Sequence, residues 1–231
     1  RSAARGLPRN LDAPTIEVLA PDASAGGART EIRVGAEGAE FRAPKGQGNY
    51  YWISARQQTK EGIVTASTVR YFSNPGPAPT ELLTRRKGEL ELIPQPLPRE
   101  HSYYRAGERW EFLVRFRGEP LPDAAVVLET EHGTRTVFRS DARGVVRIAL
   151  PNDFQPRTPS ATGGHAGHGP PRAGFVLGVE HTDDGVHHLS AFNYVYTPEA
   201  FDRKSLWAGL GFTLFGMVLA APLVRRKPKG A

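Results

Sequence analysis

The sequence contains no cysteine among its 231 residues. This absence excludes disulfide bridges, thiolate metal sites and cysteine nucleophiles. The motifs of several enzyme classes are also absent: the chain has no G-x-S-x-G elbow, no H-E-x-x-H, no P-loop and no dinucleotide-binding fingerprint. No histidine is matched to a convincing nucleophile. We therefore expect a protein that is not an enzyme and has no catalytic residues.

The net charge of the chain is small outside its last seven residues. The sequence holds 30 Lys and Arg against 24 Asp and Glu, a net charge of +6. Removing the four cations of the last seven residues leaves 26 against 24, so the rest of the chain is nearly neutral. No DNA- or RNA-binding motif is present, and we expect no nucleic-acid partner. The four cations are Arg225, Arg226, Lys227 and Lys229.

Long apolar runs are absent except at residues 206–224, which carry no charge. As a helix, these 19 residues would be about 28 Å long, close to the thickness of a bilayer core. The cations that follow favour a cytoplasmic C-terminus. The sequence thus predicts one transmembrane helix and a basic tail in 199–231, with the preceding residues on the outer side of a bacterial inner membrane. The alternative, a buried core helix, should show a polar face, and this run has none.

An outer location requires a secretory signal. We therefore expect that Arg1 follows a removed signal peptide, or that the sequence omits one.

Small residues recur along the predicted helix at spacings of four, three and four. This spacing places them on one helix face, where they would let another transmembrane helix approach closely. It indicates a subunit docked against integral membrane proteins as well as lipid. The alternative is that glycine and alanine are simply common in membrane helices. The residues are Gly209, Thr213, Gly216 and Ala220.

The rest of the chain is typical of a β protein. It contains 25 glycines and 20 prolines, and short alternating runs are separated by turn residues. We expect a mainly β fold with one transmembrane helix. The expected segments are a loose arm (1–12), a small β domain (13–73), a proline-rich linker (74–88) and a β-sandwich (89–198).

Local patterns predict individual elements of the second β domain. Apolar residues alternate with polar ones over 110–117, which indicates a half-buried strand with one wet face. The stretch 140–144 reads as a type I turn. Asp184-Gly185 predicts a hairpin turn that pairs His181 with His188. A shift of one residue would pair His181 with His187 instead.

The turn motifs carry a family resemblance. The stretch "FRGEPLPDAAVVLE…FRSDARGVVRIALP" resembles a pattern of periplasmic Ig-like or transthyretin-like sandwiches. That pattern occurs in the NikM-like family, an uncharacterised periplasmic component associated with nickel and cobalt uptake. The resemblance covers about 89–198 well and 13–73 loosely, and it implies two Ig-like or transthyretin-like sandwich domains. The family often begins with a metal-capable histidine, whereas this chain begins with Arg1.

Five histidines are candidate metal ligands. His165 and His168 lie in the glycine-rich loop 155–174, and His181, His187 and His188 flank the hairpin turn. Imidazole nitrogens suit Ni²⁺, Cu²⁺ or Zn²⁺, so a loop folded over the hairpin would bring four of them together. The alternatives are a flexible solvated loop and an exposed polar hairpin tip.

Five aromatic residues cluster in the first β domain. Consecutive positions in a strand point to opposite faces, so these residues either form an exposed patch for a protein partner or pack against the second domain. The residues are Tyr50, Tyr51, Trp52, Tyr71 and Phe72.

The sequence favours a non-catalytic, membrane-anchored periplasmic accessory subunit of an inner-membrane complex. The resemblance implies a role in metal uptake or membrane electron transfer. Two alternatives stay open: a stand-alone periplasmic metal-binding protein that uses the histidines, and an adhesive or scaffold module.

Overall fold

The computed structural model describes residues 3–6, 11–21, 29–43, 48–73, 76–99, 102–155 and 171–198. Residues 1–198 form one compact unit. The predicted transmembrane helix, its small-residue face and the basic tail lie outside the described residues. Within the described part of the chain, no helix is long and apolar enough to cross a membrane.

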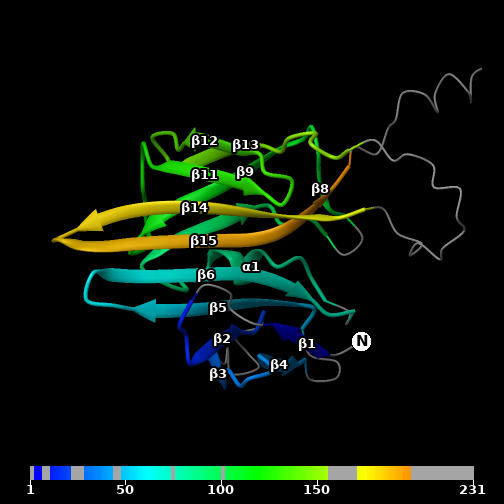
Figure 1. Ribbon diagram of the computed structural model, residues 1–231, viewed down its shortest axis with the longest axis vertical. Helices are drawn as coiled ribbons and strands as arrows, with labels where there is room; N and C mark the ends of the chain where they lie inside the picture. Colours follow the sequence, from blue (N-terminus) through cyan, green and yellow to red (C-terminus); the bar gives the residue numbers. More distant parts are fainter. Residues whose placement is uncertain are drawn as a thin grey trace, which may run out of the picture. The chain divides into compact units, whose positions relative to one another are not determined.

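A nine-stranded sheet runs through the unit, and β15 lies near its centre (Figure 1). β15 (Val186–Thr197) pairs with β14 (Ala173–Asp183) in antiparallel fashion and with β6 (Gly62–Tyr71) in parallel. The sheet therefore joins the two halves of the sequence. Its other strands are β12 (Arg135–Arg139), β11 (Ala125–Thr130), β5 (Tyr50–Gln58), β2 (Thr15–Leu19), β3 (Arg29–Arg33) and β8 (Tyr104–Arg105).

A four-stranded sheet contributes to the same core. Its strands are β7 (Leu90–Gln95), β9 (Arg109–Phe116), β10 (Glu119–Pro120) and β13 (Val145–Ala149). Side chains of both sheets meet in one apolar cluster, in which Phe112 of β9 and Phe192 of β15 lie with their ring centroids 5.8 Å apart. The fold is thus mainly β and sandwich-like, as the sequence predicts.

A second core lies on the opposite face of β2 and β5. Because neighbouring strand residues point to opposite faces, Tyr50 and Trp52 enter the first core and Tyr51 enters the second. The second core also receives Phe41 from β4 (Ala39–Arg42), which pairs with β1 (Ala3–Gly6). Both faces of β5 are therefore covered at residues 50–52. The expected aromatic cluster is packed inside, and the alternative of an exposed aromatic patch is not seen.

Three expected boundaries differ from the structure. Residues 3–6, expected in a loose arm, form β1. The expected linker contains the short helix α1 (Thr80–Thr84), which buries Leu82 and Leu83. The two expected β domains share the large sheet through the β6–β15 pairing. A side chain at Gly62 would overlap the carbonyl oxygen of His187, so glycine lets the two strands meet there.

Two predicted turns are confirmed. The Asp141 carboxylate accepts hydrogen bonds from the backbone N–H groups of Arg143 (2.9 Å) and Val145 (3.0 Å). The turn ends at Gly144, whose positive φ of 73° suits glycine. Asp184 and Gly185 both have positive φ and connect β14 to β15. Two positive φ values in succession are the geometry of the type I′ hairpin turn.

Strand β9 lies one residue earlier than its predicted span of 110–117, and its predicted wet face is buried at Arg115. Phe112 and Val114 enter the core as expected. Arg115 was expected in water, yet it is only 8 % exposed. It lies directly opposite Glu91 of β7, and the segment after α1 covers it.

Candidate functional site

The hairpin histidines occupy two faces of the sheet. His181 pairs with His188, and Thr182 pairs with His187, as the two-residue turn predicts. Residues opposite one another share a face, so His181 and His188 point to one side and His187 to the other. The ring of Phe116 lies against both inward-facing imidazoles, with centroid distances of 4.6 Å to His181 and 5.1 Å to His188.

The hairpin does not gather three ligands at one point. His187 Nδ1 lies 3.4 Å from Thr182 Oγ1, and its Nε2 lies 3.8 Å from Glu180 Oε2. Among the residues that the structure describes, no group of three or more His, Asp or Glu side chains is arranged to hold a metal ion. His165 and His168 lie outside the described residues.

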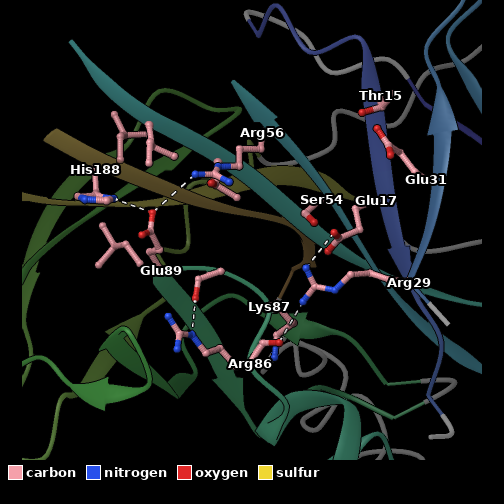
Figure 2. A pocket seen from close by; sticks show the side chains of 15 residues that line it. Thr15, Glu17, Arg29, Glu31, Ser54, Arg56, Arg86, Lys87, Glu89 and His188 are labelled. Atoms are coloured by element: carbon pink, nitrogen blue, oxygen red, sulfur yellow. Dashed lines mark hydrogen bonds and ion pairs between the residues drawn. The ribbon is translucent and has the colours of Figure 1, made fainter. Parts of the chain in front are cut away.

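The structure instead shows a polar cleft on the inner face of the large sheet. Its volume is about 590 Å³, and segment 86–90 covers it. Figure 2 shows the side chains that line it. In the sequence, polar and apolar residues alternate along the strands that form this cleft. Glu17 lies opposite Ser54, and both share a face with Arg56. The residues between them point to the other face and enter the second core. The main polar lining residues are Thr15, Glu17, Arg29, Glu31, Ser54, Arg56, Thr65, Arg86, Lys87, Glu89 and His188.

One end of the cleft holds buried polar atoms without hydrogen bonds. His188 is 2 % exposed, and neither ring nitrogen has a hydrogen-bond partner among the described residues. Glu89 Oε2 is likewise buried without one. This oxygen lies 3.7 Å from His188 Nδ1 and 3.7 Å from Arg56 Nη2 (Figure 2). Both distances exceed hydrogen-bond length, so the carboxylate is held loosely between two nitrogen groups.

The other end of the cleft is held more tightly. Arg29 Nη1 donates to Glu17 Oε2 at 3.0 Å, and its Nη2 donates to the carbonyl oxygen of Arg86 at 3.3 Å. These contacts tie β2 and β3 to the covering segment. Arg86 Nε donates in turn to the carbonyl oxygen of Gly88 at 3.2 Å.

A buried ion cluster of Lys87, Glu91 and Arg115 holds the covering segment in place. Lys87 Nζ donates to three carbonyl oxygens of the α1 region, at 2.6, 2.9 and 3.2 Å. Arg115 Nε donates to Glu91 Oε2 at 2.8 Å, and the backbone N–H of Lys87 donates to Glu91 Oε1 at 3.0 Å. The Lys87 ammonium also lies 4.7 Å from the ring centroid of Trp52. Lys87 and Arg115 are therefore already bound to protein groups. The role of these two cations is to hold segment 84–91 in position.

Burial lowers the pKa of Lys87 to about 8, although nearby Glu91 acts in the opposite direction. Between this value and its ordinary 10.5, the unfolded chain holds more protons on Lys87 than the folded chain does. Stability from this residue therefore rises as pH rises through that interval. Between pH 8 and about pH 10, we expect the wild type to gain on the order of 2 kcal/mol of unfolding free energy relative to Lys87→Met. Urea unfolding of both full-length chains in detergent measures this gain, and parallel pH profiles would contradict it.

Sequence reasoning missed the cleft residues, with the exception of His188. Polar residues at alternate strand positions mark a polar face, but they do not reveal what covers it. Of the covering residues, Arg86 lies within the expected linker 74–88 and Glu89 follows it directly.

Comparisons with known proteins add no functional assignment. No family model matches the sequence, and no curated protein matches it. A two-domain fibronectin type III segment of chicken tenascin is similar among solved structures, with 10% identity, 84% of this chain and 90% of that chain covered, and a TM-score of 0.25. A likeness this weak supports no argument about function.

Proposed function

We propose that the chain is a non-catalytic, membrane-anchored accessory subunit of an inner-membrane complex, with its β unit on the periplasmic side. The observation that carries this proposal is the uncharged run 206–224, followed at once by a cluster of cations. A run of this length matches a bilayer core, and the cations favour a cytoplasmic C-terminus.

The described fold is compatible with this role. A mainly β, sandwich-like unit ends with β15 at Thr197, shortly before the apolar run begins. We propose that the sandwich is of the Ig-like or transthyretin-like kind, in line with the turn motifs around 140–144. The resemblance of those motifs also favours a complex for metal uptake or membrane electron transfer.

Fractionation of cells tests the anchor. The full chain, expressed behind a secretory signal peptide, should stay in the membrane after alkaline carbonate washing. Replacing Leu214 and Val218 by arginine should release it, because a charge at the bilayer centre costs about 3 kcal/mol. The matched control replaces the same residues by isoleucine and leucine and should leave it in the membrane. A wild-type chain that is freely soluble without detergent would overturn the proposal.

Co-purification in mild detergent tests the accessory role. The wild type should bring integral membrane proteins with it. Replacing Gly209 and Gly216 by leucine should leave the chain in the membrane but release those partners, because bulky side chains block close helix packing. Partners that remain bound to the leucine variant would show that this helix face does not hold the complex.

A further inference from the structure

The end of the cleft that holds His188, Glu89 and Arg56 has buried polar atoms that a ligand would help to satisfy. A neutral imidazole has one donor and one acceptor nitrogen, and burying both without partners costs free energy. The same holds for the buried oxygen of Glu89. Both groups lie at a cleft of about 590 Å³, a volume typical of small-molecule sites.

The charges at this end identify the chemistry of the ligand. At the other end Arg29 is bound to Glu17, and the Lys87 amine is bound to backbone carbonyl groups. Arg56 and Glu89 form a loose ion pair, whose charged atoms lie 3.7 Å apart, beyond hydrogen-bond length. Glu89 would repel a simple anion placed beside Arg56, and Arg56 would repel a simple cation placed beside Glu89. A molecule with both charges satisfies both side chains.

We propose that this cleft binds a small zwitterion of the amino-acid or short-peptide class. The ligand ammonium would bind the Glu89 carboxylate, and the ligand carboxylate would bind the Arg56 guanidinium, which offers paired donors for it. His188 closes the cleft beyond Glu89, and its Nδ1 lies 3.7 Å from Glu89 Oε2, so a ligand bound to Glu89 changes the surroundings of the imidazole ring. This inference does not depend on the membrane anchor.

Hydroxyl groups extend the recognition surface. Ser54 on β5 and Thr65 on β6 line the same cleft, and neither side chain has a hydrogen-bond partner among the described residues. Peptide groups offer donors and acceptors that match hydroxyls. The volume also exceeds what a single small amino acid fills, so we expect a dipeptide to bind more tightly than glycine.

Calorimetric titration of the full chain in mild detergent tests the proposal. The probes are L-alanyl-L-alanine and glycine, with acetate and ethylamine as single-charge controls. We expect heat from the dipeptide and at least about tenfold weaker binding of either control. The ring ¹⁵N signals of His188, assigned with the variant His188→Gln, should shift when the dipeptide is added.

Two cleft variants and a matched pair decide the outcome. Arg56→Gln and Glu89→Gln should each weaken dipeptide binding at least about tenfold, which is about 1.4 kcal/mol. The Arg56 side chain is 56% exposed, so its loss should leave the thermal unfolding curve unchanged. Arg147→Gln and Glu111→Gln alter an exposed ion pair away from the cleft and should leave binding unchanged.

Three results would overturn the zwitterion site. The first is no heat and no His188 shift from any probe at about 10 mM, a concentration that detects even weak binding. The second is binding of acetate or ethylamine as tight as that of the dipeptide. The third is dipeptide binding that survives Arg56→Gln in a folded chain.

Discussion

Replacing Glu91 by alanine should lower the free energy of unfolding by about 3–5 kcal/mol. The Glu91 side chain is 4% exposed and accepts from Arg115 Nε at 2.8 Å and from Arg115 Nη2 at 3.2 Å. Without the carboxylate, Arg115 and Lys87 remain buried with no counter-charge. An uncompensated buried charge costs far more than an exposed ion pair contributes.

The matched control is Glu111→Ala. Glu111 pairs with Arg147 at the same 2.8 Å, but these side chains are 45% and 63% exposed. Water and salt screen such a pair, so the expected loss is below about 1 kcal/mol. Urea unfolding of the full chain in detergent, followed by circular dichroism, measures both losses. Equal small losses would show that Glu91 does not neutralise a buried charge.

Replacing Phe192 by alanine should also cost about 3–5 kcal/mol. The residue is fully buried on β15, and its ring centroid lies 5.8 Å from those of both Trp52 and Phe112. These partners come from the first part of the chain and from the four-stranded sheet. Removal of the ring leaves a cavity at the point where all three segments meet.

The number of unfolding transitions of Phe192→Ala is as informative as its loss of unfolding free energy. Because residues 1–198 form one compact unit, the variant should still unfold in a single transition. Tryptophan fluorescence and circular dichroism should then report the same midpoint. Val137→Ala, at a residue that is 58% exposed, should cost less than about 0.5 kcal/mol and serves as the control. Two separate transitions would contradict a single compact unit.

Local elements of the fold could be predicted because their causes are local. Asp184-Gly185 specifies a two-residue turn, and the turn fixes the pairing of His181 with His188. Alternation over 110–117 likewise predicts strand β9, which the structure forms over Arg109–Phe116. In each case the residues that determine the structure lie within a few positions of one another.

Long-range pairing could not be predicted, so the joining of the two expected β domains was missed. The expected division near residue 73 rested on a proline-rich composition. The actual sheet continues across it, because β6 pairs with a strand more than a hundred residues later. The exposure predicted for Arg115 of β9 is wrong for the same reason, since Glu91 and the segment after α1 cover this side chain, whereas the Glu111 side chain on the same face is 45% exposed.

The candidate site was predicted only in part. The histidine pairing is confirmed, but the pattern did not reveal that Phe116 lies against His181 and His188 or that His187 faces the other way. The cleft depends on segment 86–90 lying over the polar face of β5, which is a tertiary arrangement without a local sequence signal.

The parallel junction of β6 with β15 has a consequence for how the chain is made. The ribosome completes residues 62–71 long before residues 186–197. The edge of β6 that pairs with β15 therefore stays unpaired while the rest of the chain is synthesised. Closing so distant a pair is slow, and an open edge attracts other chains. We expect the newly made protein to depend on a holding chaperone until β15 has been synthesised.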